Sequence, residues 1–306
     1  NFPTCPFPNP EIKQALELGM KYCEETGSDL LLATDPDCDR VGIAVKWNGD
    51  YKLLTGNEVG ALLLDYVASQ RIAMGTMPAK PLAVKTIVTT DLCQKIADKY
   101  GVELVNVLTG FKFIGEQIGR MEAKGEEGNY IFGFEESYGY LAGTYVRDKD
   151  AVVASMLICE MAAFYSKQGK NLVEVLNGLY ETYGYYLCTQ QSFAFEGEQG
   201  MTEMKALMES LREHPAAVIG EDKVLGFGDY LRSVHTDMVT GEKTEITLPK
   251  SDVLMYEMEN GCKAVIRPSG TEPKIKIYYF VVRENESSAR EKEKELQNSF
   301  TKLLRV

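Results

Sequence analysis

Three aspartates alternate within a short polar segment whose sequence is DPDCDR. Carboxylate oxygens suit a hard cation, and their alternation in a tight loop allows Asp35, Asp37 and Asp39 to converge on one ion. An EF-hand loop is excluded because Arg40 stands where its glycine belongs and Lys46 stands where its bidentate glutamate belongs. Mg²⁺ takes few carboxylates and leaves positions for phosphate oxygens, with which Arg40 can also pair. The pattern predicts a Mg²⁺ site, and a hairpin of solvated acids is the alternative.

A second polar segment, RPSGTEPK, lies between an apolar run and a run of alternating residues. Arg267 and Lys274 supply positive charge, Ser269 and Thr271 supply hydroxyls, and Gly270 lets the backbone approach a ligand closely. These are the donors that an oxyanion needs, so the segment predicts a phosphate-binding loop. An ordinary hairpin turn is the alternative, because Pro, Ser and Gly are common in turns.

A third segment, GFEESYGY, follows the end of a predicted strand, where α/β sheets generally bind ligands. The carboxylate of Glu135 and the hydroxyl of Ser137 are two residues apart and could bind neighbouring sugar hydroxyls. A helix cap or a solvated acidic turn is the alternative.

Two lysines lie near predicted helix starts: Lys112 in the segment TGFK, after Thr109 and Gly110, and Lys149 in the segment RDKD. Helix N-termini attract anions, so each lysine could reach a phosphate or move a proton. A solvated surface lysine is the alternative for either one.

Alternating strands and helices must position these segments. Apolar runs at residues 30–33 and 41–45 place the three aspartates on a loop between two strands. Strands predicted at residues 82–90, 102–107 and 130–134 alternate with helical patterns, which is typical of βαβ units and a parallel sheet.

This α/β region is expected to end near residue 184. Beyond it the predicted strands cluster, and the two predicted helices lie near residues 201–212 and 286–304. Consecutive strands with few helices between them are typical of an α+β domain built on an antiparallel sheet. The expected fold class is therefore α/β followed by α+β, with a parallel or mixed sheet first and a C-terminal antiparallel sheet.

The composition excludes several classes of partner. The chain has 306 residues, 33 Lys and Arg against 45 Asp and Glu, and a net charge of −12, which disfavours nucleic-acid binding. Its longest apolar run, residues 151–165, contains Glu160 and falls short of the roughly 20 residues that span a bilayer, so no membrane partner is expected. Seven cysteines, with no CxxC pair, favour a reducing cytoplasm. The start at an asparagine without a signal peptide indicates a fragment or a trimmed chain.

The five segments DPDCDR, TGFK, GFEESYG, RDKD and RPSGTEPK, in this order, resemble those of the α-D-phosphohexomutase family. The GFEES form is similar to that of the phosphoglucomutase branch. The resemblance covers the whole chain and implies four domains around one cleft. Residues 1–47 would be the end of the second domain with the metal loop, 48–184 the third with the sugar loop, and 185–306 the fourth with the phosphate loop.

In this family a phosphorylated serine gives its phosphoryl group to a phosphosugar, and the resulting bisphosphate turns around and returns the other phosphate. The resemblance implies Mg²⁺ as cofactor, held by Asp35, Asp37 and Asp39, with glucose 1,6-bisphosphate as intermediate or activator. Implied catalytic residues are Arg40, Lys112 and Lys149, where the roles of the two lysines stay open. The implied substrate-binding residues are Thr109, Gly110, Glu135, Ser137, Arg267, Ser269, Gly270, Thr271 and Lys274.

The serine loop of the family, usually close to TASHNP, has no counterpart here, because the chain contains no Ser-His-Asn. We therefore expect a carboxyl-terminal portion whose partners are the missing amino-terminal domains, and which alone does not interconvert glucose 1-phosphate and glucose 6-phosphate. Three alternatives stay open: a non-catalytic phosphosugar-binding module, a Mg²⁺-dependent phosphatase, and another sugar specificity such as that of a phosphopentomutase.

Overall fold

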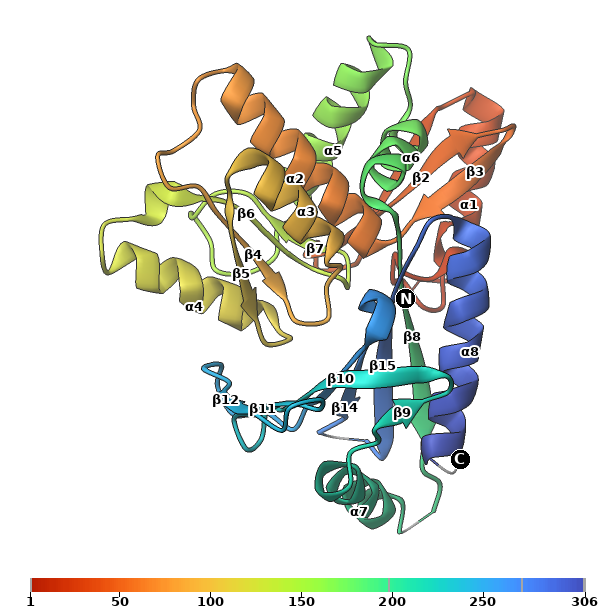
Figure 1. Ribbon diagram of the computed structural model, residues 1–306. Coiled ribbons are helices and arrows are strands. Elements are labelled where there is room, and N and C mark those ends of the chain that lie inside the picture. Colours follow the sequence, from red (N-terminus) through yellow and green to blue (C-terminus); the bar gives the residue numbers. More distant parts are fainter. Residues whose placement is uncertain (1, 198, 271, 305–306) are drawn as a thin grey trace. The chain divides into compact units, whose positions relative to one another are not determined.

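The computed structural model describes residues 2–197, 199–270 and 272–304 and divides into two compact units, Asn1–Tyr183 and Gly184–Val306 (Figure 1). Each unit has its own hydrophobic core. The expected fold class is confirmed, because a mixed α/β sheet lies in the first unit and an antiparallel sheet in the second.

The first unit begins with one helix and three antiparallel strands. These are α1 (Lys13–Thr26), β1 (Leu30–Thr34), β2 (Val41–Trp47) and β3 (Asp50–Leu54), with strand order β1-β2-β3. Gly27 ends α1 in a left-handed conformation at φ 70°. Strand β3 was not expected from the sequence, and it extends the sheet beyond residue 47, where one domain boundary is predicted.

A second sheet, of order β5-β4-β6-β7, carries the βαβ units of the same unit. Its elements are α2 (Gly56–Ala73), β4 (Leu82–Thr86), α3 (Leu92–Tyr100), β5 (Glu103–Val107), α4 (Phe111–Glu122), η1 (Glu127–Asn129), β6 (Tyr130–Glu135), β7 (Gly139–Leu141), α5 (Ala151–Ser166) and α6 (Leu172–Tyr183). Strands β4, β5 and β6 are parallel, and β7 runs antiparallel to β6. The carboxyl ends of the three parallel strands therefore meet at one edge of the sheet, where ligands bind in such folds.

Two helices cover opposite faces of this sheet. The buried side chains of α4, including Ile114 and Ile118, pack against Val84 and Leu141 on one face. On the other face α2 comes so close that a Cβ on Gly60 would lie 1.9 Å from the ring of Phe134. Coverage of both faces explains why every residue of β4 is buried.

Strand β4 is shorter than the sequence predicted. It ends at Thr86 instead of residue 90, because the chain then turns and the amide of Thr89 donates to the carbonyl of Thr86 (3.1 Å). The β-branched residues beyond Thr86 belong to this buried turn.

The second unit is a sheet of order β12-β11-β10-β13-β14-β15-β8, in which neighbouring strands are antiparallel. Its elements are β8 (Tyr185–Ala194), α7 (Gly200–Glu213), β9 (Val218–Ile219), β10 (Asp222–Asp229), β11 (Val234–Asp237), β12 (Lys243–Glu245), β13 (Leu254–Met258), η2 (Glu259–Gly261), β14 (Lys263–Pro268), β15 (Lys274–Arg283) and α8 (Glu286–Leu304). Helix α8 packs on β15 and β8 through an apolar stripe that includes Leu296 and Phe300. This sheet carries the loop between β14 and β15.

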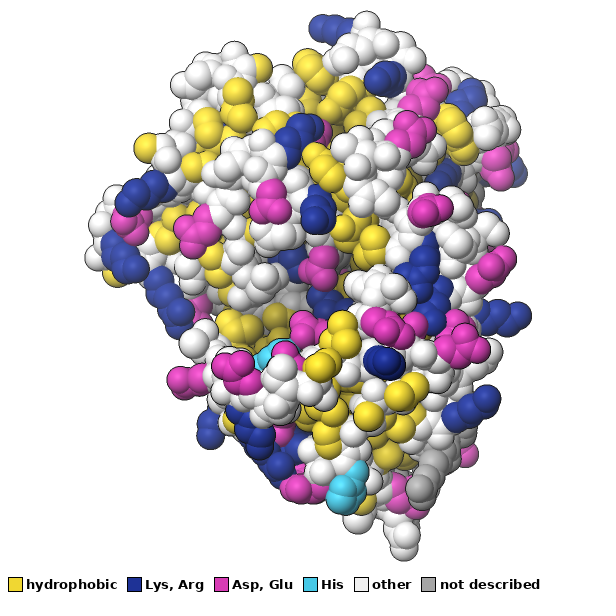
Figure 2. All heavy atoms as spheres, viewed as in Figure 1, with side chains coloured by type: hydrophobic (Ala, Val, Ile, Leu, Met, Phe, Trp, Pro, Cys, Tyr) yellow, Lys and Arg dark blue, Asp and Glu magenta, His cyan; other side chains and the backbone are white. Residues whose placement is uncertain are grey.

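Charged side chains of both signs are interspersed on the face shown in Figure 2. None of the helices in the described ranges is both long and apolar enough to cross a membrane.

Candidate functional site

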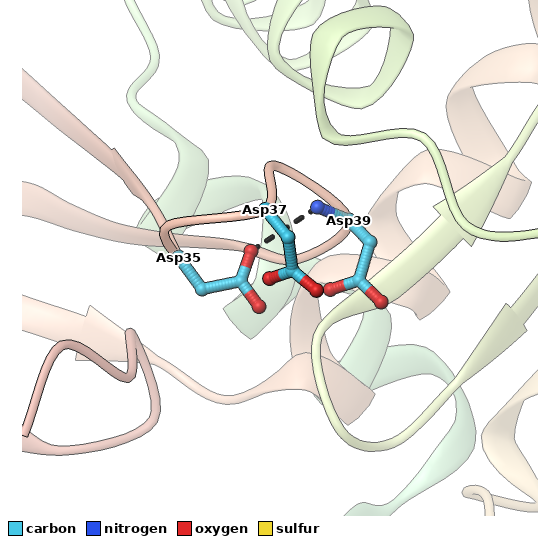
Figure 3. Close-up of side chains that lie close together, drawn as sticks. All are labelled: Asp35, Asp37 and Asp39. Atoms are coloured by element: carbon cyan, nitrogen blue, oxygen red, sulfur yellow. Dashed lines mark hydrogen bonds between the residues drawn. The ribbon is translucent and has the colours of Figure 1, made fainter.

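The three aspartates occupy the turn of the β1–β2 hairpin. Thr34 pairs with Val41 at the end of the hairpin, and Cys38 closes the turn in a left-handed conformation at φ 60°. Oδ1 of Asp35 accepts hydrogen bonds from the amides of Asp39 (3.1 Å) and Arg40 (3.0 Å), which shapes the loop. The three carboxylates lie together on one side of the loop (Figure 3).

The donor set fits a hard cation. One oxygen from each of Asp35, Asp37 and Asp39 lies within 4.8 Å of the others. Oδ1 of Asp39 is buried and has no hydrogen-bond partner within the described ranges, which leaves its lone pairs available to an ion. Burial and the neighbouring Asp39 raise the pKa of Asp35, so holding these charges together without a cation is costly. Three carboxylate oxygens suit Mg²⁺, which fills its remaining positions with water or phosphate oxygens.

Arg40 lies beside this metal loop. Its guanidinium Nη1 is 3.2 Å from Oε1 of Glu11, and its Nε is 3.9 Å from Asp35 and 3.8 Å from Asp39. The guanidinium is therefore held next to Asp35 and Asp39 by its attraction to these two carboxylates and to that of Glu11. Glu11, which the sequence analysis did not single out, orients it.

Lys149 reaches the same loop from the segment before α5. Its ammonium lies 2.8 Å from Oδ2 of Asp39 and 3.2 Å from Asp148. Burial opposes the charge of the ammonium, but the bond to Asp39 and the charge of Asp148 outweigh burial and raise the pKa of Lys149. Burial likewise opposes the charge of Asp39, and Lys149 outweighs it and lowers the pKa of that carboxyl.

The backbone fixes this approach. The amide of Ala151 donates to the carbonyl of Cys38 (3.2 Å), which ties the start of α5 to the metal loop. The stem of Lys149 lies against Gly139, where a Cβ would be 2.1 Å from its Cδ. Glycine at residue 139 therefore leaves the space that the lysine occupies.

Glu135, the last residue of β6, connects two further segments. Glu135 is only 5% exposed, and its Oε1 accepts a hydrogen bond from the amide of Gly110 (2.8 Å). Gly110 stands at the N-cap of α4 with φ 119°, a conformation that favours glycine. Burial raises the pKa of Glu135, although the nearby Lys149 opposes this shift. The segments TGFK and GFEESYG thus meet at the carboxyl ends of β5 and β6.

The other predicted residues of this unit differ in their surroundings. Ser137 is partly buried in the turn between β6 and β7, and the carbonyl of the next residue, Tyr138, accepts from the amide of Val41 (3.1 Å). Oγ1 of Thr109 is buried and has no hydrogen-bond partner among the residues that the structure describes. Lys112 is exposed on α4 with its ammonium 4.9 Å from the ring centroid of Phe113. The structure therefore gathers the metal loop, Thr109–Gly110, Glu135–Ser137 and Lys149, and leaves Lys112 at the surface.

The RPSGTEPK segment forms the hairpin between β14 and β15 in the second unit. Pro268 pairs with Ile275, and the amide of Ser269 donates to the carbonyl of Lys274 (2.8 Å). Oγ of Ser269 accepts from the amide of Glu272 (3.3 Å), and the ammonium of Lys274 lies 2.8 Å from that carboxylate, which lowers the pKa of Glu272.

Arg267 is partly buried and Gly270 is exposed in this hairpin, and Thr271 lies outside the described residues. Among the described residues, the predicted donors Arg267, Ser269, Gly270 and Lys274 therefore share a single hairpin of the antiparallel sheet.

The sequence analysis did not single out the carboxylate of Glu136, which directly follows Glu135. Oε2 of Glu136 accepts from the hydroxyl of Thr86 (3.2 Å), and burial together with the charge of Glu135 raises the pKa of Glu136 to about 7. Its position directly after a buried strand was the only signal in the sequence.

Comparison with known proteins gives a consistent result. Two domain families match: "Phosphoglucomutase/phosphomannomutase, alpha/beta/alpha domain III" over residues 55–183, and "alpha/beta/alpha domain II" of the same family over residues 1–48. The phosphoglucomutase of Staphylococcus saprophyticus is 37% identical over 287 residues, which is 93% of this chain and 51% of that protein. The phosphoglucomutase of Staphylococcus aureus strain USA300 is 38% identical over 279 residues, which is 91% of this chain and 49% of that protein. The chain thus spans about half the length of these relatives.

Solved structures show the same fold. Parafusin, a phosphoglucomutase from Paramecium, covers 97% of this chain with a TM-score of 0.63 at 17% identity, and the match takes in 50% of that protein. A phosphoglucomutase/phosphomannomutase family protein from Burkholderia thailandensis covers 97% with a TM-score of 0.63 at 16% identity, over 51% of that protein. At these identities the likeness supports the fold alone.

Proposed function

Because the chain belongs to the α-D-phosphohexomutase family, in its phosphoglucomutase branch, we propose that it is the carboxyl-terminal part of an enzyme that interconverts glucose 1-phosphate and glucose 6-phosphate. The observation that carries this proposal is the meeting of four segments in the first unit. They are joined by the contacts of Lys149 with Asp39 and of Gly110 with Glu135, and by the bond from the amide of Val41, next to Arg40, to the carbonyl of Tyr138. We further propose the domain limits 1–47, 48–184 and 185–306 and a cytoplasmic location.

The metal loop would serve the transferred phosphoryl group. Asp35, Asp37 and Asp39 would hold Mg²⁺, which when bound neutralises charge on that group. Arg40 carries a fork of donors that matches phosphate oxygens, and its ion pair with Glu11 keeps it beside the loop. Lys149, held as an ammonium, adds positive charge at the same place.

The neighbouring residues would bind the sugar. Glu135 presents a buried carboxylate that accepts from hydroxyls, and Ser137 follows two residues later with a hydroxyl of its own. The buried, unpartnered hydroxyl of Thr109 is a further donor at this edge of the sheet. Gripping hydroxyls rather than the phosphate lets either end of the sugar be presented to the phosphoryl donor. Lys112 would contact the substrate from its exposed position, or move a proton.

The hairpin of the second unit would hold the phosphate that does not react. Arg267, Ser269, Gly270, Thr271 and Lys274 are the proposed ligands. Binding energy from a remote phosphate positions the reacting end, so this loop should contribute to turnover as well as to affinity.

The nucleophile is not among these residues. The phosphoryl group would pass from a phosphoserine to the free hydroxyl of the sugar, whose proton is released, and the other phosphate of glucose 1,6-bisphosphate would then return to the serine. The family's serine loop is not in this sequence, so we propose that the chain needs amino-terminal domains as partners and does not turn over alone.

The test is an assay of the purified chain. It is incubated with glucose 1-phosphate, Mg²⁺ and a trace of glucose 1,6-bisphosphate, and glucose 6-phosphate and free phosphate are both followed. We expect neither product. Glucose 6-phosphate formed at an enzymatic rate would place a nucleophile within these residues and contradict the inactivity, and release of phosphate alone would favour a phosphatase.

A further inference from the structure

Glu135 and Glu136 are adjacent in sequence, yet their carboxylates are bound at the ends of different strands. The carboxylate of Glu135 meets Gly110, which follows β5, whereas that of Glu136 meets Thr86, the last residue of β4. Glu135 is the last residue of β6 and Glu136 is the first residue of the turn that follows, so the two bonds tie this end of β6 to Gly110 after β5 and to Thr86 at the end of β4. We propose that Glu136 is a positioning residue that fixes the sugar-binding carboxylate of Glu135 through its hydrogen bond with Thr86. The sugar-binding part of this inference rests on the function proposed above.

The hydrogen bonds of Thr86 account for its whole capacity. Its side chain is fully buried, and its Oγ1 accepts from the amide of Val88 (3.3 Å) and lies 2.7 Å from Oγ1 of Thr89. A hydroxyl has one proton and two lone pairs. Since the amide of Val88 uses one lone pair, and the Thr89 hydroxyl can use the second, the proton of Thr86 is available for Oε2 of Glu136.

A buried lysine makes this support rigid. Lys85 is only 1% exposed, and its ammonium donates to the carbonyl of Thr89 (3.0 Å) and to Oδ1 of Asp91 (3.0 Å). The turn after β4 is thus held by a charge-assisted bond as well as by its own backbone bonds. Thr86 therefore offers Glu136 a fixed attachment point.

Close packing holds the other side of the turn. A Cβ on Gly56 would lie 2.1 Å from the carbonyl oxygen of Glu136, so the start of α2 presses directly on this peptide. Glu136 is therefore held twice, by its carbonyl oxygen against α2 and by its carboxylate at the end of β4, directly after Glu135.

The experiment measures, in the absence of sugar, how often the hydrogen bond between the amide of Gly110 and the carboxylate of Glu135 opens. We expect the amide proton of Gly110, which donates to Glu135, to exchange slowly in the whole chain, as followed by NMR. Thr86→Val removes the donor and Glu136→Met removes the acceptor, so each should speed this exchange about tenfold. Thr86→Ser keeps the hydroxyl and Glu136→Gln keeps an acceptor oxygen, so both should restore wild-type exchange. Ile158→Val, a buried deletion in α5, is the control for general destabilisation.

The outcomes separate the two proposals. Unchanged Gly110 exchange in both Thr86→Val and Glu136→Met, or equal acceleration in Ile158→Val, would overturn the positioning role. If exchange rises only in those two variants, titration with glucose 1,6-bisphosphate then decides the sugar role. Affinity that falls in Thr86→Val and recovers in Thr86→Ser supports both proposals. A wild-type chain that binds no bisphosphate, with selective exchange intact, would keep the positioning role and refute the proposed function.

Discussion

The amide of Gly110 donates a 2.8 Å hydrogen bond to Oε1 of Glu135, 25 residues further along the chain. This bond joins the start of α4 to the end of β6 at the edge where parallel strands β4, β5 and β6 all end. It orients one carboxylate oxygen with a backbone donor. A side chain fixed in this way loses little further freedom when it binds a ligand.

Replacing Glu135 by glutamine should weaken sugar binding. A hydrogen bond to a charged group contributes about 1.5–3 kcal/mol, so the dissociation constant of glucose 1,6-bisphosphate should rise about 10- to 100-fold. Calorimetric titration in the presence of Mg²⁺ measures it. Glu116→Gln, an exposed change on α4, should leave the constant unaltered. Equal affinity in Glu135→Gln and wild type would remove Glu135 from the site.

Two glycines of α4, one at its N-cap and one in its interior, give a matched pair. Gly110→Ala places a Cβ at φ 119° and should lower stability by about 1–3 kcal/mol. Gly119→Ala lies within the same helix with open space around its Cβ, and should raise stability by about 0.5–1 kcal/mol. Urea unfolding of both variants compares them. A stable Gly110→Ala would mean that the N-cap tolerates another conformation.

Mg²⁺ should stabilise the chain through the metal loop. A ligand that binds only the folded state raises the melting temperature, and Asp37→Asn removes one carboxylate of the three. The variant should lose most of the rise that Mg²⁺ produces in the wild type, as thermal melting with and without the ion will show. Asp98→Asn on α3 is the control. A full Mg²⁺ shift in Asp37→Asn would place the ion elsewhere.

The raised pKa of Glu136 predicts that the free energy of unfolding depends on pH. Burial, with the charges of Glu135 and Glu11, raises its pKa from 4.5 to about 7, while Thr86 opposes the shift. An acid whose folded pKa is raised contributes stability that is fully present below its unfolded pKa, and this contribution is lost as pH rises through about 7. Glu136→Gln removes the titration, so its unfolding free energy should fall less than that of wild type between pH 5.5 and 8.5. Parallel curves for the two proteins would contradict this prediction.

Local patterns predicted the position of the loop that carries the three aspartates. The three aspartates lie within five residues of one another, and the apolar runs on both sides correctly indicated a hairpin. Strands β3 and β7 were missed because each is short and lacks a long run of alternating residues. The strand expected to reach residue 90 ends at Thr86, because a buried turn can carry the same β-branched residues as a strand.

Long-range partners could not be predicted. Glu11 precedes Arg40 by 29 residues, and Thr86 precedes Glu136 by 50, so only the folded chain brings each pair together. The sequence also could not distinguish the two candidate lysines. Lys112 and Lys149 looked alike in sequence, yet only Lys149 lies within an ion-pair distance of Asp39, while the ammonium of Lys112 lies over the Phe113 ring.

The central claim is that the metal loop and the Glu135 turn form one site for Mg²⁺ and a phosphosugar. Calorimetric titration of glucose 1,6-bisphosphate into the chain, with and without Mg²⁺, tests it most directly. The account predicts saturable binding that Mg²⁺ strengthens in the wild type and no longer strengthens in Asp37→Asn. No binding at all, or binding that is equally strong without Mg²⁺, would contradict it.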